Sequence, residues 1–315
     1  MLRHILKLLR IYNIAFIALF QIIIRYCIIL PILNYHNIEP TLTNVQFAML
    51  VLTTVLIAAG GNVINDYFDL ISDKINRPEK VVVDKHLDRR TAILIHVILT
   101  LIGVFIGLYY AFIFHKENYA LIFIGVPILL WFYSTTFKKQ MLVGNLVVAM
   151  LTALTALLVV SFEFAALSIS NGSDITDSMA CKQAWLVTSA FAFFAFITNL
   201  SREIIKDMED IEGDIAIGCK TLPIEMGTKY SKIIIILLQI FMLAILWIGL
   251  YTIDKYIFSF SKGIPPASLI TISTLWSIYL LTKATTSKQY HRVSLVCKIT
   301  MLIGTLSIVY LKFIH

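Results

Sequence analysis

Residues 45–73 read VQFAMLVLTTVLIAAGGNVINDYFDLISD, an apolar run that is long enough to cross a membrane and ends in three aspartates. Asp66, Asp69 and Asp73 lie three and four residues apart, and on a continuous helix this spacing places all three carboxylates on one face. Such a cluster repels itself unless cations neutralise it. The stretch therefore predicts a membrane helix whose end carries an acidic, cation-binding site.

The same D-x-x-D-x-x-x-D spacing occurs again 141 residues later, in Asp207, Asp210 and Asp214. Each triad follows an apolar stretch and precedes a basic one. Oxygen ligands without His or Cys favour Mg²⁺, with Mn²⁺ as the alternative, and Asn65 adds an amide oxygen one turn before Asp69. Two matching clusters indicate a shared divalent-metal site, which a phosphate-bearing substrate would complete.

The composition excludes an ordinary soluble protein, because 59% of the residues are hydrophobic, only 14% are charged, and the mean hydropathy is +0.85. A helix needs about 20 residues to cross the hydrocarbon core of a membrane. We therefore expect one all-α domain over residues 1–315, a polytopic bundle of about nine transmembrane helices. The nine apolar stretches are 14–33, 45–64, 91–113, 118–136, 141–162, 184–201, 233–251, 264–282 and 296–313.

Basic residues are distributed unevenly between the two sides of this bundle. If the N-terminus is cytoplasmic, the inner segments carry 20 of the 26 Lys and Arg, as the positive-inside rule requires. Both triads then fall on the same inner side, which the charge count did not require. Topology and anionic membrane lipids account for the net charge of +7, so no nucleic-acid partner is expected. The inner segments are 1–13, 65–90, 137–140, 202–232 and 283–298.

Two further motifs stand between the triads. Residues 76–78 read N-R-P, directly after the first triad, and residues 133–138 read YSTTFK, which matches Y-S-x-x-x-K. The order of these motifs resembles that of the UbiA superfamily of intramembrane prenyltransferases. The resemblance covers nearly the whole chain and includes the nine helices.

The resemblance implies an enzyme that transfers a prenyl group from a polyprenyl diphosphate to a lipophilic acceptor and releases diphosphate. Two Mg²⁺ ions would bridge the triads and the diphosphate, and basic side chains would stabilise the negative charge that develops on the leaving group. The catalytic carboxylates would be Asp69, Asp73, Asp210 and Asp214. The metal ligands would be Asn65, Asp66, Asp69, Asp73, Asp207, Asp210 and Asp214. The diphosphate-binding cations would be Arg77, Lys138, Lys74 and Lys206.

Three more residues are expected to bind substrate. Asn13 and Arg10 resemble the R-x-x-N of the first helix in many relatives, where it lines the substrate cavity. Tyr133 offers an aromatic face to the allylic cation that forms when diphosphate leaves. Arg25 lies inside the first apolar stretch, where a charge is costly unless it faces the bundle interior or reaches the interface. A cavity position would let Arg25 meet a negative charge on the acceptor.

The sequence leaves the acceptor open. Residues 75–83, INRPEKVVV, together with Gln21 and Arg25, look most like members that use geranylgeranylglyceryl phosphate, with geranylgeranyl diphosphate as the donor. The alternatives are aromatic acceptors of quinone synthesis, namely 4-hydroxybenzoate, dihydroxynaphthoate and homogentisate, and an acceptor of haem synthesis. Within loop 79–90 the chain departs from the family pattern, because Asp84 stands where a small residue is common.

Two other classes of membrane protein also use acidic residues. A transporter would place its acids near mid-span on broken helices, whereas the triads here stand at helix ends. A CDP-alcohol phosphotransferase also pairs Asp with Mg²⁺, but its Asp-Gly and Ala-Arg signature is missing from both motifs. We expect a bacterial inner membrane protein with a cytoplasmic active site, and the sequence indicates no oligomeric state.

Overall fold

The computed structural model of the chain describes residues 2–79, 81–253 and 260–314. Within these ranges nine helices are long and apolar enough to cross a membrane, which confirms the predicted number and an integral, multi-pass membrane protein. The first span, Ile11–Tyr35, is built from α2 (Ile11–Ile24), the π-helical turn η1 (Arg25–Ile29) and α3 (Leu30–Tyr35). The other spans are α4 (Asn44–Phe68), α6 (Arg89–Ile113), α7 (Glu117–Thr135), α8 (Val143–Asn171), α9 (Met179–Glu209), α12 (Gly227–Ile253), α13 (Phe260–Lys283) and α14 (Ser287–Ile314).

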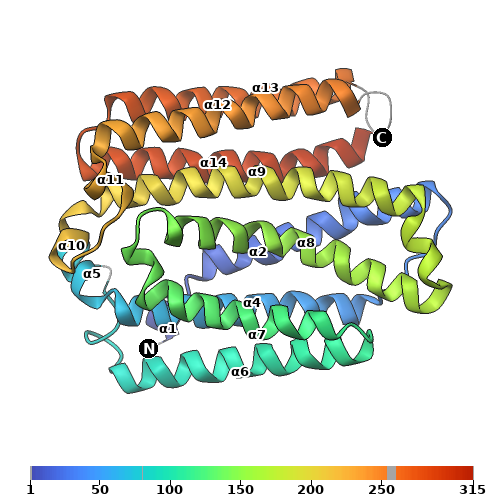
Figure 1. Cartoon of the computed structure of the whole chain (residues 1–315), viewed down its shortest axis with the longest axis horizontal. Helices are drawn as coiled ribbons and strands as arrows, with labels where there is room; N and C mark the ends of the chain where they lie inside the picture. The colour runs from blue at the N-terminus through green and yellow to red at the C-terminus, as the bar shows by residue number, and fades with distance from the viewer. Residues whose placement is uncertain (1, 80, 254–259, 315) are drawn as a thin grey trace.

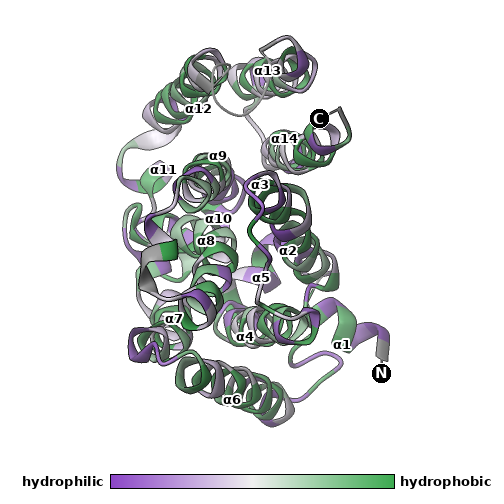
Figure 2. Ribbon diagram, turned by 90° about the vertical axis from the view of Figure 1, so that its right-hand side faces the viewer, coloured by the Kyte–Doolittle hydropathy of each residue, from purple (hydrophilic) through white to green (hydrophobic). Residues whose placement is uncertain are grey.

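The spans run along the long axis of the molecule, and the short helices gather at one end of it (Figure 1). These short helices are α5 (Leu70–Asn76), α10 (Ile211–Ala216) and α11 (Leu222–Glu225). Viewed along the spans, α8 and α9 lie between a group formed by α4, α6 and α7 and a group formed by α12, α13 and α14 (Figure 2). Because α5 follows α4 and α10 follows α9, both triads lie at the end with the short helices.

An aromatic cluster fills the core of the opposite half of the bundle. Phe162 of α8 is fully buried. Its ring centroid lies 4.6 Å from that of Tyr119, 5.6 Å from that of Phe114, 5.8 Å from that of Phe123 and 6.0 Å from that of Tyr110. Aromatic pairs at these distances add to the stabilisation from apolar burial. The cluster therefore packs the ends of α6 and α7 against α8, away from the triads.

Neither triad lies on one continuous helix, in contrast to the prediction from its spacing. Asp69 alone separates α4 from α5, with φ −82° and ψ 0°, and Asp210 alone separates α9 from α10, with φ −105° and ψ 11°. A ψ near zero turns the chain away from the helix axis, because a helix needs about −42°. The third carboxylate of each triad, Asp73 or Asp214, is therefore carried by a short helix that leaves the span at an angle.

The loop after the first triad packs onto the N-terminal helix α1 (Leu2–Leu8). Val82 and Val83 are buried in a small cluster with Leu8. Asp84, the residue that departs from the family pattern, has a left-handed φ of 69°, a conformation that Asp tolerates better than most residues. Lys80 lies outside the described residues. The loop is thus anchored by apolar contacts beside the triads.

Candidate active site

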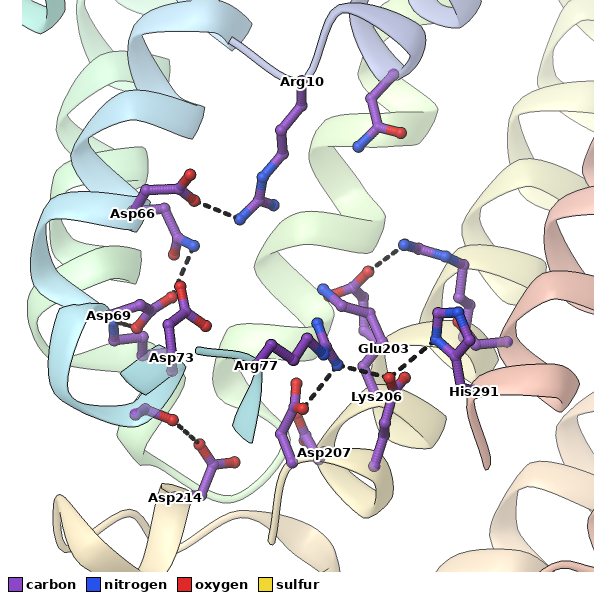
Figure 3. Close-up of a pocket in the computed structure, with 18 of the residues that line it drawn as sticks. Arg10, Asp66, Asp69, Asp73, Arg77, Glu203, Lys206, Asp207, Asp214 and His291 are labelled. Carbon is purple, nitrogen blue, oxygen red and sulfur yellow. Dashed lines mark hydrogen bonds and ion pairs between the residues drawn. The ribbon is translucent and has the colours of Figure 1, made fainter. Parts of the chain in front are cut away.

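A cavity of about 400 Å³ lies at the triad end of the bundle, between α4, α5, α9, α10 and α14. All six aspartates of the two triads line it, although 141 residues separate the triads in the sequence. In Figure 3, Asp66, Asp69 and Asp73 occupy one wall, and Asp207 and Asp214 approach from α9 and α10. The fold therefore places both triads on one cavity.

The carboxylates of the first triad meet basic and amide side chains. Arg10, which stands between α1 and α2, donates from Nη2 to Asp66 Oδ1 at 2.6 Å. The ammonium group of Lys138 contacts Asp69 Oδ1. Asn65 donates from Nδ2 to Asp69 Oδ2 at 2.7 Å. Cations from two other parts of the chain thus pair with Asp66 and Asp69.

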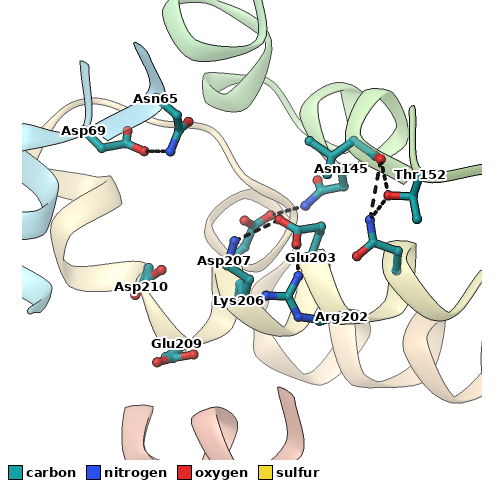
Figure 4. A network of polar contacts seen from close by, with 12 residues as sticks. Asn65, Asp69, Asn145, Thr152, Arg202, Glu203, Lys206, Asp207, Glu209 and Asp210 are labelled. Carbon is teal, nitrogen blue, oxygen red and sulfur yellow. Dashed lines mark hydrogen bonds and ion pairs between the residues drawn. The ribbon is translucent and has the colours of Figure 1, made fainter. Parts of the chain in front are cut away.

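The second triad has an equivalent set of partners. Arg77 reaches from the N-R-P motif and donates to Asp210 Oδ1 at 2.6 Å and to Glu209 Oε1 at 2.8 Å. Asn145 of α8 donates to Asp207 Oδ2 at 2.9 Å (Figure 4). Arg77 therefore bridges the motifs, because it follows the first triad in the sequence and pairs with the second in space.

Asn76 ties the two short helices together. Its Oδ1 accepts from the backbone N–H of Gly213 at 2.9 Å, and its Nδ2 donates to the carbonyl of Asp210 at 3.1 Å. A Cβ on Gly213 would lie 2.3 Å from Asn76 Nδ2, so only glycine permits this approach. Because α5 and α10 are linked directly, the two triads are held at a fixed separation across the cavity.

The carboxyl groups on the short helices are difficult to ionise as they stand. Burial and the negative charges of Asp69 and Asp66 raise the pKa of Asp73 to about 6. Burial and the charges of Asp210 and Asp69 raise the pKa of Asp214 to about 7. Burial also raises the pKa of Asp210, although Arg77 opposes this effect. Added positive charge would relieve these clusters, which is the electrostatic property of a cation-binding site.

The donor set fits Mg²⁺ that is completed by other ligands. No three His, Cys, Asp or Glu side chains in the described ranges lie close enough together to hold an ion by themselves. Mg²⁺ commonly takes only one or two carboxylates and keeps waters or substrate phosphates in its other positions. Asn65 provides a structural indication, because its buried Oδ1 has no hydrogen-bond partner among the described residues. This oxygen stands beside the Asp69 carboxylate and is available to a cation.

Most of the residues predicted from the sequence meet at this cavity. In addition to the triads, Asn13, Asn65, Arg77, Tyr133, Lys138 and Lys206 line it. Lys74 does not, because its ammonium group points to Asp84 at 3.0 Å, and more than half of its side-chain surface is exposed. Because Lys74 follows Asp73 in the sequence, it was expected to contact the diphosphate, but its side chain faces outward from the short helix α5.

Arg25 also lies away from the cavity. Its Nε donates to Glu163 Oε2 at 3.0 Å, its Nη1 donates to Asn44 Oδ1 at 2.9 Å, and its Nη2 contacts the carbonyl of Leu42. The Arg25 and Glu163 side chains are 2% and 0% exposed. The sequence predicted that Arg25 either faces the bundle interior or reaches the interface, and the structure places it in the interior. There the carboxylate of Glu163 neutralises its charge, and the side chain does not reach the triad cavity.

Several cavity residues were not predicted as site residues. Arg202 and Glu203 lie one turn before Lys206 and Asp207 on α9, a spacing that places them on the same face. His291 and Lys298 come from α14, where no motif marks them, and His291 Nδ1 lies 2.9 Å from Glu209 Oε1. For Arg202 and Glu203, their helical spacing from Lys206 and Asp207 could have indicated a place at the cavity. The position of α14 beside α9 is a tertiary feature that the sequence pattern does not reveal.

Comparison with known proteins identifies the family. The model of the UbiA prenyltransferase family matches residues 33–296. The chain is 35% identical to the digeranylgeranylglyceryl phosphate synthase of Methanosphaera stadtmanae, over 80% of this chain and 83% of the relative. It is 32% identical to the protein of the same name from Thermococcus sibiricus, over 82% of each chain.

Solved structures share the fold. A structure described as that of a digeranylgeranylglyceryl phosphate synthase aligns with a TM-score of 0.64 at 23% identity, over 100% of this chain and 99% of the other. A UbiA homologue from Archaeoglobus fulgidus, bound to DMAPP and Mg²⁺, aligns with a TM-score of 0.57 at 16% identity, over 97% of this chain and 99% of the other. With the nine spans, the paired aspartate triads and the family match in agreement, the chain belongs to the UbiA prenyltransferase family.

Proposed function

We propose that this prenyltransferase transfers a geranylgeranyl group from geranylgeranyl diphosphate to geranylgeranylglyceryl phosphate. The observation that carries the proposal is the single cavity on which both aspartate triads and their basic partners converge. Family membership supports the reaction class, and the relatives named digeranylgeranylglyceryl phosphate synthase support the acceptor. Aromatic acceptors have no comparable support among the named relatives.

The residues of the cavity divide into ligands for cations and ligands for phosphate. We assign Asn65 and the six triad aspartates to Mg²⁺, which when bound supplies positive charge that neutralises the diphosphate and eases its departure. Arg77 and Lys138 stand beside Asp210 and Asp69, where they can donate to diphosphate oxygens. Lys206 lines the same cavity, and we retain it as a third phosphate ligand.

In the proposed reaction the allylic C–O bond of the donor breaks, and the diphosphate leaves with the bonding electrons. The hydroxyl oxygen of the acceptor forms the new C–O bond to the allylic carbon, and its proton passes to the released diphosphate. Basic side chains stabilise the charge on the leaving group, and Tyr133 presents an aromatic ring to the allylic cation. We assign Asn13, which lines the cavity near Arg10, to the binding of substrate.

The position of Lys138 depends on Gly144, the second residue of α8. A Cβ at Gly144 would lie 2.8 Å from Lys138 Cα and 3.0 Å from the carbonyl oxygen of Phe137, so Gly144→Ala must displace the backbone that carries Lys138. We expect kcat/KM to fall by about tenfold or more, since misplacing a charge-stabilising group weakens its contact with the transition state. Steady-state kinetics with purified protein measures this effect.

The matched control is Gly125→Ala on α7, where a new Cβ meets no atom within 4 Å. Both changes add one methyl group inside a membrane helix, so only the contact with the Lys138 segment differs. Equal kcat/KM for the two variants would show that the position of Lys138 does not limit catalysis.

We further propose that the cavity faces the cytoplasm. The segments at the triad end carry most of the basic residues, and the positive-inside rule places such segments on the cytoplasmic side. The named relatives come from archaea, so the bacterial inner membrane stays a prediction from the sequence alone.

The test of the function offers radiolabelled geranylgeranyl diphosphate to the purified protein with Mg²⁺ and one acceptor at a time. We expect label to enter a phosphate-bearing lipid with geranylgeranylglyceryl phosphate as the acceptor, and EDTA to stop the reaction. Labelling of 4-hydroxybenzoate without labelling of the glyceryl phosphate would overturn the acceptor. Failure to bind the diphosphate at all would overturn the enzyme assignment and favour a transporter.

A further inference from the structure

The wall of the cavity formed by α9 and α14 carries cations that form no ion pair with a triad aspartate, and two of them, Arg202 and Lys298, have no role in the proposed binding of diphosphate. Arg202 donates from Nη1 to Glu203 Oε1 at 2.5 Å, and Lys206 donates to Glu203 Oε2 at 3.0 Å (Figure 4). Lys298 of α14 lines the same cavity and lies within electrostatic reach of both Arg202 and Lys206. Figure 3 shows Glu203 and Lys206 on this wall, opposite Asp66 and Asp69.

The charge balance of this wall differs from that of the triads. Arg10, Lys138 and Arg77 each contact a triad carboxylate, so those cations are already neutralised. On the opposite wall Arg202 and Lys206 pair with the carboxylate of Glu203, and Lys298 forms no ion pair with the described residues. The other acids that α9 brings to the cavity have partners elsewhere, because Asp207 accepts from Asn145 and Glu209 pairs with Arg77 and His291. The surroundings of Arg202 and Lys298 are therefore suited to an anion.

Two further features of the wall indicate a ligand. Arg202 has 14% of its side chain exposed, and its Nε is a buried donor without a hydrogen-bond partner among the described residues. A buried donor without a partner is costly, and a ligand oxygen would satisfy it. Ser294, one turn before Lys298 on α14, brings a hydroxyl group to the same cavity and is 5% exposed.

The two substrates of the proposed reaction are both anions, which creates a need for a second phosphate site. The phosphate monoester of the acceptor carries about −1.5 to −2 charges at pH 7, and the diphosphate adds more negative charge in the same cavity. Two such groups repel each other unless each has its own cations. The triads and their metal serve the diphosphate, so the acceptor requires a different set.

We propose that Arg202 and Lys298, with the hydroxyl of Ser294, bind the phosphate monoester of the prenyl acceptor. The guanidinium group offers a planar fork that matches phosphate oxygens, and the ammonium group adds a point charge from the neighbouring helix. Glu203 holds Arg202 in place through the contact at its Nη1. This inference rests on the proposed function, because it assumes an acceptor that carries a phosphate.

The test compares Arg202→Gln and Lys298→Gln with wild type in steady-state kinetics, varying each substrate separately. We expect the KM for geranylgeranylglyceryl phosphate to rise about tenfold to a hundredfold, since each variant loses a hydrogen bond to a charged group. The KM for geranylgeranyl diphosphate should stay within about twofold, because the triads hold that substrate. Lys288→Gln is the matched control, since Lys288 is exposed on α14 and does not line the cavity.

An acceptor without phosphate separates binding from a general structural effect. With geranylgeranylglycerol, wild type and both variants should show the same low kcat/KM, because the proposed contact is absent in all three. A loss with geranylgeranylglycerol as large as that with the phosphate would mean that the variants damage the fold. If Arg202→Gln does not fold, two variants still test the proposal. Arg202→Lys keeps the positive charge, and Lys298→Gln changes the more accessible of the two side chains.

The two proposals fail in different ways. If wild type labels geranylgeranylglyceryl phosphate but both variants keep the wild-type KM for it, the second phosphate site is wrong and the proposed function stands. If wild type labels only an acceptor without phosphate, both proposals are wrong. A rise in the KM for the diphosphate instead of the acceptor would assign Arg202 and Lys298 to the donor and overturn the inference.

Discussion

Replacing Asp69 or Asp210 by alanine should reduce turnover by about a thousandfold or more, while leaving membrane insertion and folding intact. Each residue is the middle aspartate of its triad, at the joint between a span and a short helix. Each also contacts one of the basic side chains that we assign to diphosphate, Lys138 or Arg77. Alanine thus removes a proposed metal ligand and the partner of a catalytic cation together, and the loss of one preorganised stabilising group alone costs about 10²–10³ in rate.

The measurement is the initial rate of label transfer over a range of Mg²⁺ concentrations, together with size-exclusion profiles of the detergent-solubilised protein. Glu212→Ala is the matched control, because Glu212 is an exposed acid on α10 that does not line the cavity. We expect Glu212→Ala to retain near wild-type turnover and Mg²⁺ dependence. Activity retained in Asp69→Ala or Asp210→Ala would count against the assignment of the triads to the metal.

The repeated aspartate spacing carried most of the predictable information about the site. It indicated correctly that two segments 141 residues apart belong together, because each triad ends an apolar span and both ends fall on one side of the bundle. It did not reveal the break at Asp69 and Asp210, since a spacing of three and four fits a straight helix and a kinked one equally well. At each break one backbone hydrogen bond ends and the next begins, from Asp69 to Asn65 and from Asp73 to Asp69, and the same pattern holds at Asp210.

Residues whose roles depend on helix packing were beyond the reach of sequence patterns. Lys74 and Arg77 stand three residues apart, yet only the side chain of Arg77 points into the cavity. The helix α5 ends at Asn76, so Arg77 lies beyond the helix and takes a different direction. Arg202 and Lys298 line the same cavity because α9 packs against α14, which no motif marks. A pattern of charges identifies candidates, but the choice of partner is made by the tertiary fold.

Arg25 shows the same limitation in a different part of the bundle. Its carboxylate partner Glu163 lies 138 residues away on α8, inside an otherwise apolar stretch. Their contact joins the π-helical turn of the first span to the centre of the bundle. Asn44 Oδ1 accepts from Nη1, the carbonyl of Leu42 accepts from Nη2, and the Arg25 side chain is 2% exposed, so the charge is buried within the protein.

We therefore expect Glu163→Ala to destabilise the protein by about 3–5 kcal/mol, because it leaves the Arg25 guanidinium buried without its counter-ion. The double variant Arg25→Leu/Glu163→Leu should recover most of that loss, since two apolar side chains of similar size avoid the cost of burying charge. Thermal unfolding in one detergent, followed by intrinsic fluorescence, measures both effects. Because the pair lies away from the triad cavity, the double variant should also keep its catalytic activity.

If the double variant is as unstable as Glu163→Ala, the instability comes from lost packing rather than from an unpaired charge. If it is stable but inactive, Arg25 serves the reaction, as the sequence first suggested.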